Sequence, residues 1–114
     1  LYTDVLGLKL KDIEVVVEQK VKTALIPVGE SMVELIESTD PEGTIAKFIE
    51  SRGEGLHHVA FEVENIEQAL ATMVSKGVAL IDAKPRGGVE NSRVAFLHPR
   101  GTGRVLMELV ESVK

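Results

Sequence analysis

Residues 55–63, which read Gly-Leu-His-His-Val-Ala-Phe-Glu-Val, constrain the fold of this chain more than any other stretch. In an extended strand, successive side chains point to opposite faces. One face then carries four residues that we expect in the hydrophobic core: His57, Val59, Phe61 and Val63. The other face carries His58 beside Ala60 and Glu62, which predicts one wall of a pocket. A histidine near a strand end is also commonly a hydrogen-bonded structural residue, so both roles are open for His58.

The composition excludes several classes of protein. With 114 residues, the chain is long enough for one domain with an ordinary core. It has no cysteine, which rules out disulfides, thiolate chemistry and zinc fingers. Its formal net charge of -5 argues against nucleic acid or an anionic membrane as a partner. Because no apolar run approaches the roughly 20 residues of a bilayer span, we expect a soluble, cytoplasmic protein.

The first half of the chain has the pattern of an antiparallel meander. Residues 1–7 resemble the last turns of a helix that Gly7 ends. Three strand-like segments joined by tight turns follow, at residues 8–17, 20–28 and 31–37. Asp40 as an N-cap and Pro41 at the first helical position predict a short helix up to Gly53, which links the two halves.

The second half has a stronger helix signal. Asn65 is an N-cap residue with Gln68 three positions later, a capping-box pattern, and Gly77 ends the predicted helix. Three further strands are expected, at residues 78–83, 92–97 and 104–111. A loop at residues 84–88 and a turn at residues 98–103 separate them, and we expect a structural role for His98 in that turn.

The two halves resemble each other, since each has a helix followed by three strands. The similar segments are residues 24–27 with 33–37 in the first half and 95–99 with 107–111 in the second. This duplication would make Glu34 and Glu108 equivalent carboxylates, partly buried beside apolar neighbours and in need of a partner such as a metal ion. The alternative is that both simply face solvent, as glutamates in strands usually do. Symmetry also predicts a strand with a second histidine before Leu1.

Five strings carry a resemblance to a known family. They are Leu-Tyr-Thr-Asp-Val-Leu-Gly-Leu at 1–8, Val-Glu-Leu-Ile-Glu at 33–37, Gly-Leu-His-His-Val-Ala at 55–60, Phe-Leu-His-Pro-Arg at 96–100 and Val-Leu-Met-Glu-Leu at 105–109. Over essentially its whole length the chain resembles the vicinal oxygen chelate superfamily, and within it the methylmalonyl-CoA epimerase family.

The resemblance implies an α+β fold of paired βαβββ modules that form an incompletely closed, concave β-barrel. We expect a single domain over residues 1–114, here lacking the first strand of module 1. Its parts would be module 1 at about 1–38, a linker helix at about 40–53 and module 2 at about 55–114.

The resemblance also implies a divalent metal site. Carried over residue by residue, it makes His58, Glu108 and Glu34 the metal ligands, with one more histidine on the strand expected before Leu1. Cobalt is the metal implied first, and manganese, nickel or zinc also suit nitrogen and oxygen ligands. The implied reaction interconverts (2R)- and (2S)-methylmalonyl-CoA through a metal-stabilised enolate, with Glu34 and Glu108 exchanging the proton. The implied partners are an acyl-CoA substrate and a second copy of the chain in a homodimer.

The CoA part of such a substrate needs cations. Four basic residues flank the two glycine-containing loops of the second half and are candidates for its phosphates: Lys84, Arg86, Arg100 and Arg104. Each of them also fits the role of a solubilising surface charge.

Three rival functions share parts of this pattern. A glyoxalase I-type lactoylglutathione lyase would use the same ligands and enolate chemistry, and an extradiol dioxygenase would need iron with two histidines and a carboxylate. A metal-free module that binds a small molecule is the rival of a different class. It predicts no bound metal and no loss of function on replacing Glu108.

Overall fold

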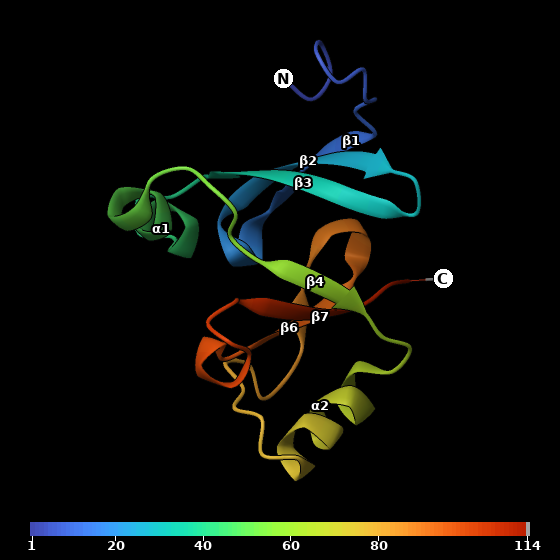
Figure 1. The fold of residues 1–114 in the computed structure, drawn as a ribbon, viewed down its shortest axis with the longest axis vertical. Coiled ribbons are helices and arrows are strands. Elements are labelled where there is room, and N and C mark those ends of the chain that lie inside the picture. The colour runs from blue at the N-terminus through green and yellow to red at the C-terminus, as the bar shows by residue number, and fades with distance from the viewer. Residues whose placement is uncertain (114) are drawn as a thin grey trace. The chain divides into compact units, whose positions relative to one another are not determined.

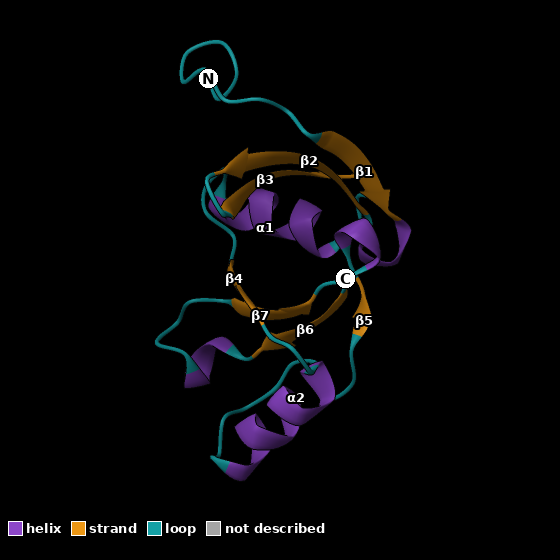
Figure 2. Cartoon of the chain, turned by 90° about the vertical axis from the view of Figure 1, so that its right-hand side faces the viewer, coloured by secondary structure: helices purple, strands orange, loops and turns teal. Residues whose placement is uncertain are grey.

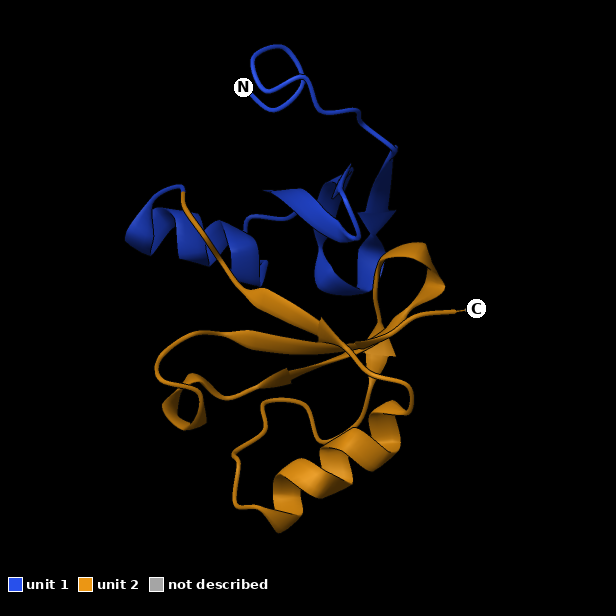
Figure 3. Ribbon diagram, turned by 45° about the vertical axis from the view of Figure 1, so that its right-hand side comes forward, with its two compact units in different colours: residues 1–54 blue, residues 55–114 orange. Residues whose placement is uncertain are grey.

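The chain divides into two compact units, Leu1–Glu54 and Gly55–Lys114 (Figure 3). A computed structural model describes residues 1–113, and each unit combines strands with one α-helix (Figure 2). The strands form two sheets, one of three strands and one of four. The expected α+β class is therefore confirmed.

Unit 1 contains the predicted meander, and its strands are paired in the antiparallel order β1-β2-β3 (Figure 1). Its elements are β1 (Asp12–Val16), a 3₁₀ turn (Val17–Gln19), β2 (Val21–Val28), β3 (Ser31–Ser38) and α1 (Thr44–Arg52). The first strand begins at Asp12 and not at Leu8. Residues 1–7 form hydrogen-bonded turns and no regular helix, although Gly7 adopts the left-handed conformation expected of it, with φ of 71°.

The helix of unit 1 starts later than its sequence signals predict. The Oδ1 of Asp40 accepts a hydrogen bond from the backbone N–H of Glu42, so this side chain caps a turn and not the helix. The N-cap of α1 is Gly43. The predicted end is confirmed, because Gly53 has φ of 74° and its N–H donates to the carbonyl of Ile49.

Unit 2 is a four-stranded sheet in the order β4-β7-β6-β5 with α2 against one face (Figure 1). Its elements are β4 (Val59–Glu62), α2 (Ile66–Ser75), β5 (Arg86–Gly87), a 3₁₀ turn (Val89–Asn91), β6 (Arg93–Leu97), a 3₁₀ turn (Pro99–Gly101) and β7 (Met107–Glu111). β4 is parallel to β7, which is antiparallel to β6. The Asn65 cap is confirmed, because its Oδ1 accepts from the N–H of Gln68 at 3.0 Å.

Two of the strands predicted in unit 2 differ from the structure. Residues 78–83 contribute a single bridge between Leu80 and Leu97, because the carboxylate of Asp82 takes the hydrogen bond from the N–H of Phe96 and interrupts the ladder. The short β5 lies instead in the segment predicted as a loop. The last strand begins at Met107 and not at Arg104, whose φ of 72° is incompatible with a strand.

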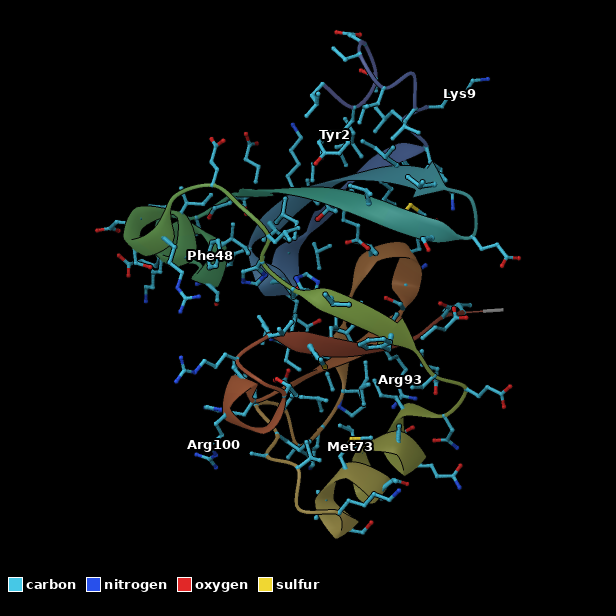
Figure 4. The ribbon with its side chains drawn as sticks, in the orientation of Figure 1. Tyr2, Lys9, Phe48, Met73, Arg93 and Arg100 are labelled. Carbon is cyan, nitrogen blue, oxygen red and sulfur yellow. The ribbon has the colours of Figure 1, made fainter. Side chains whose placement is uncertain are left out.

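The core of unit 2 lies between α2 and the sheet. Ile66 and Leu70 of α2 pack against three buried strand residues, Ala95, Leu97 and Leu109. Met73 of α2 is partly buried against the same cluster (Figure 4). This packing covers one face of the sheet, and α2 does not cover the opposite face. In the described part of the chain, neither α1 nor α2 has the length and hydrophobicity needed to span a membrane.

The edge position of β4 explains why its expected core face is only partly buried. Val59 and Phe61 pair with Met107 and Leu109, which face the core, so the predicted alternation is correct. Both side chains are nevertheless about half exposed, at 48% and 51%. Val63 does pack against the core.

Candidate active site

A histidine and a glutamate meet on the face of the unit 2 sheet that α2 does not cover. Glu108 of β7 pairs with Phe96 on one side and Ala60 on the other, and these positions alternate with the core residues. The Nε2 of His58, just before β4, lies 3.5 Å from the Oε1 of Glu108. Both side chains are largely buried, with exposed fractions of 14% and 10%. The face of the sheet on which His58 lies thus also carries a carboxylate from another strand.

His57 belongs to the same cluster, contrary to the prediction that it faces the core. Its Nδ1 lies 2.9 Å from the Nδ1 of His58. The alternation fails here because β4 begins only at Val59, so the backbone at residue 57 is not part of the strand. Sequence reasoning missed this residue, and the doubled histidine was its only signal. Burial, followed by the nearby His58, lowers the pKa of His57 and favours its neutral form.

The contact between the two histidines links the tautomer of His58 to the atom that it presents to Glu108. A hydrogen bond between two Nδ1 atoms requires one of them to donate and the other to accept. When His58 donates from Nδ1, its Nε2 is an unprotonated nitrogen facing a carboxylate oxygen. That is the arrangement of two ligands for one cation.

An aromatic ring and an arginine extend this cluster across the sheet. The ring of Phe96 meets the ring of His58 edge to face, with centroids 5.4 Å apart. The guanidinium of Arg86 lies over the same ring, 5.4 Å from the Phe96 centroid. The Nε of Arg86 is 3.4 Å from the Oδ2 of Asp82. The free face of the sheet therefore carries one residue from or next to each of its four strands: His58, Glu108, Phe96 and Arg86.

The predicted equivalence of Glu34 and Glu108 extends to their strand registers. Glu34 on β3 pairs with Leu25 on β2, as Glu108 on β7 pairs with Phe96 on β6. Their burial differs, however: Glu108 is 8% exposed, whereas Glu34 is exposed. The prediction of partial burial is correct for Glu108 and wrong for Glu34, because β3 is the last strand of its sheet and Glu34 does not pack in a core.

The four basic candidates occupy different environments. Lys84, Arg100 and Arg104 are exposed, whereas Arg86 is partly buried. Arg100 extends from the turn Pro99–Gly101 (Figure 4), and the N–H of Arg104 donates to the carbonyl of Pro99 in that turn. The Nδ1 of His98 accepts from the N–H of Arg100, which agrees with its expected structural role.

His58 and Glu108 fit two positions of a divalent metal site by their chemistry and distance. An imidazole nitrogen and a carboxylate oxygen are ordinary ligands of zinc, manganese, cobalt and nickel. Within residues 1–113, however, no group of three or more His, Asp or Glu side chains is arranged to hold a metal ion. The pair is therefore a partial ligand set.

The fold and this pair define an α+β protein with a polar cluster on the free face of a four-stranded sheet, and comparison with known proteins identifies its family. The model of the Glyoxalase/Bleomycin resistance protein/Dioxygenase superfamily matches residues 1–96. The chain belongs to this superfamily.

Individual relatives within this superfamily include an uncharacterized protein and methylmalonyl-CoA epimerases. The uncharacterized protein YqjC of Bacillus subtilis is 40% identical over 110 residues, which are 96% of this chain and 79% of that protein. The crystal structure of methylmalonyl-CoA epimerase from Mycobacterium tuberculosis has a TM-score of 0.93 and 36% identity, covering 99% of this chain and 77% of the other.

A third relative is a Streptomyces coelicolor methylmalonyl-CoA epimerase variant in complex with 2-nitronate-propionyl-CoA. It has a TM-score of 0.94 and 32% identity, and the match covers 98% of this chain and 82% of the other. The resemblance to methylmalonyl-CoA epimerases is confirmed, and so is the expectation of an enzyme of the isomerase class.

Proposed function

We propose that this protein interconverts (2R)- and (2S)-methylmalonyl-CoA. The observation that carries the proposal is the largely buried pair of His58 and Glu108 on the free face of the sheet. Relatives that are methylmalonyl-CoA epimerases, one of them in complex with an acyl-CoA analogue, support the choice of substrate.

The reaction removes a proton from C2 of the acyl group and returns it to the opposite face. C2 lies between a thioester carbonyl and a carboxylate, so the charge that develops on proton removal spreads onto oxygens. A divalent metal held by His58 and Glu108 would supply Lewis-acid stabilisation of that charge. The family resemblance makes cobalt the first candidate, with manganese, nickel and zinc as alternatives.

The residues around the pair would orient its ligand atoms. A hydrogen bond from the Nδ1 of His58 to the Nδ1 of His57 would fix the ring of His58, so that an unprotonated Nε2 remains aimed at Glu108. Phe96 is 7% exposed and supplies an apolar wall beside both groups. An apolar wall excludes water and strengthens the electrostatic interactions made there.

We extend the proposal to Glu34 as a second proton-transfer group, since an epimerase must serve both faces of C2. The shared register of Glu34 and Glu108 supports this role. In a Glu34→Gln variant we expect exchange of the C2 hydrogen with solvent deuterium to fall roughly 10²-fold or more for one epimer. Mass spectrometry of each epimer incubated in deuterium oxide measures this rate. Equal, wild-type exchange from both epimers would remove Glu34 from the mechanism.

We propose that three exposed cations contact the phosphates of CoA: Lys84, Arg100 and Arg104. Phosphate binding needs charged side chains that can reach the ligand.

We also keep two further predictions, that the protein forms a homodimer and that it is located in the cytoplasm. Sedimentation of the purified protein decides the first of these, and cell fractionation decides the second.

The experiment that tests the proposed function follows interconversion of the two epimers by the purified protein. We expect activity that a chelator lowers by about 10²-fold or more and that added cobalt(II) restores, because a metal held by His58 and Glu108 would stabilise the charge that develops on the substrate oxygens. Activity on the hemithioacetal of glutathione in place of methylmalonyl-CoA would support a lactoylglutathione lyase instead. Binding of CoA thioesters without proton exchange at C2 would support the metal-free binding module.

A further inference from the structure

We propose that Arg86 binds the free carboxylate of the acyl group and thereby selects malonyl-type thioesters over simple acyl thioesters. This inference rests on the proposed function and adds a residue that determines specificity. It also moves Arg86 from the CoA phosphates, where its sequence position had placed it, to the acyl end of the substrate.

The position of Arg86 on the sheet is the first argument. Arg86 pairs with Val94, which is followed two residues later by Phe96 on the same face of β6. The guanidinium lies over the Phe96 ring, 5.4 Å from its centroid, and the His58 ring centroid is also 5.4 Å from that centroid. The arginine thus lies one aromatic ring away from the histidine of the proposed site, since both contact Phe96.

This separation suits the acyl carboxylate better than the CoA phosphates. The carboxylate is bonded directly to C2, whereas the long pantetheine arm lies between C2 and the phosphates. A cation within one ring of the His58–Glu108 pair is therefore near the reacting end of the substrate.

The second argument is the ion pair that Arg86 makes through the Nε of its guanidinium. Its Nε lies 3.4 Å from the Oδ2 of Asp82, and the same oxygen accepts the hydrogen bond from the N–H of Phe96 at 2.9 Å. Asp82 therefore ties the arginine to the strand that carries Phe96. Stacking on the ring also limits the rotation of the guanidinium plane.

The third argument is that the two terminal nitrogens of the Arg86 guanidinium remain as donors for a ligand. Asp82 is the ion-pair partner of Arg86 within the described residues, and it faces Nε. The two terminal nitrogens then form the fork that binds a carboxylate with two parallel hydrogen bonds. The Arg86 side chain is 37% exposed, so a ligand can reach this fork.

Arg93 provides a contrast on the neighbouring strand. Its guanidinium is paired with Glu67 of α2 and, at 3.2 Å, with Glu111 of β7. Its charge is thus shared between two carboxylates of the protein itself. Arg93 is a matched control, because it is an arginine of the same sheet with no role in the proposed site.

The test compares binding of malonyl-CoA and acetyl-CoA by titration calorimetry. The two thioesters share every CoA phosphate and differ by one carboxylate. We expect the wild-type protein to prefer malonyl-CoA by roughly 10- to 100-fold, the range of a charge-assisted bidentate contact. Arg86→Lys is expected to reduce this preference to about threefold or less, since an ammonium group cannot hold Asp82 and a carboxylate fork together.

The affinity for acetyl-CoA should change by less than about twofold in Arg86→Lys, and Arg93→Lys should retain the wild-type preference. Arg86→Gln, checked for folding by circular dichroism, should lose the preference completely. An equal loss of affinity for both thioesters would assign Arg86 to CoA phosphates or to folding and overturn the inference. Retention of the preference in the Arg86 variants, or its absence in the wild-type protein, would overturn it as well.

The two experiments distinguish a failure of the proposed function from a failure of this inference. If the wild-type protein shows the arginine-dependent preference but exchanges no proton at C2 of methylmalonyl-CoA, Arg86 selects the carboxylate and the epimerase reaction is wrong. If the protein exchanges the proton and the preference is independent of Arg86, only the inference is wrong.

Discussion

A Glu108→Gln variant is expected to epimerise methylmalonyl-CoA about 10²- to 10⁴-fold more slowly than the wild-type protein. The substitution keeps the shape of the side chain, which is 10% exposed, and removes the charge of a carboxylate 3.5 Å from His58. A neutral amide is a poorer metal ligand and no proton acceptor, so either proposed role of Glu108 predicts the loss. Exchange of the C2 hydrogen in deuterium oxide measures the rate, and mass spectrometry measures the bound metal.

The control for this variant is Glu111→Gln on the same strand. Glu111 lies at the end of β7 toward α2, where it accepts from Arg93 and from the N–H of Ile66. The two bonds use different oxygens of Glu111, so glutamine keeps one acceptor and loses the other. Because both bonds lie outside the proposed site, we expect activity within about threefold of wild type. Wild-type exchange in Glu108→Gln with the metal retained would contradict both proposed roles of Glu108.

Local signals in the sequence predicted the elements that short-range chemistry determines. The helix α2 follows from Asn65, whose side chain caps it as expected, and from an apolar stripe with the helical period. The strands of unit 1 follow from apolar residues and the turn at residues 29–30. In these cases the residues that decide the structure are neighbours in the chain.

Where the predicted strands and their burial were wrong, the cause is a contact between residues that are distant in sequence. The interruption of residues 78–83 as a strand depends on the carboxylate of Asp82 reaching the N–H of Phe96, 14 residues later. The exposure of Phe61 depends on β4 being an edge strand, which the order of strands decides. Neither feature leaves a periodic signal in the sequence.

The candidate site could be predicted in part, for a similar reason. His58 and Glu108 were identified by resemblance, but their distance depends on the parallel pairing of β4 with β7. The stack of Arg86 on Phe96 needs the register of β5 against β6, and sequence reasoning placed Arg86 in a loop. Long-range register is what a single sequence specifies least directly.

An Ile66→Ala substitution is expected to lower the free energy of unfolding of unit 2 by about 3 to 4 kcal/mol. Ile66 is fully buried, at 0% exposed, and packs with Leu70, Ala95, Leu97 and Leu109. Its removal leaves a cavity between α2 and the sheet, which adds to the lost transfer free energy. Urea unfolding followed by circular dichroism measures the change, and amide hydrogen exchange in β6 and β7 assigns it to unit 2.

Val74→Ala is the matched control, because Val74 is 62% exposed on the same helix. It should change the unfolding free energy by less than about 0.5 kcal/mol. A loss below about 1 kcal/mol in Ile66→Ala would show that α2 is not packed on the sheet in this way.

The same substitution connects the core of unit 2 to its site. Core and site residues alternate along the strands, with Phe96 between Ala95 and Leu97 and Glu108 beside Leu109. The packing of α2 on one face therefore holds the backbone that aims Phe96 and Glu108 on the other. We expect Ile66→Ala to slow C2 proton exchange even under conditions in which the protein remains folded, whereas Val74→Ala leaves the rate unchanged. A wild-type rate in folded Ile66→Ala would mean that the strands keep the site in place without the helix.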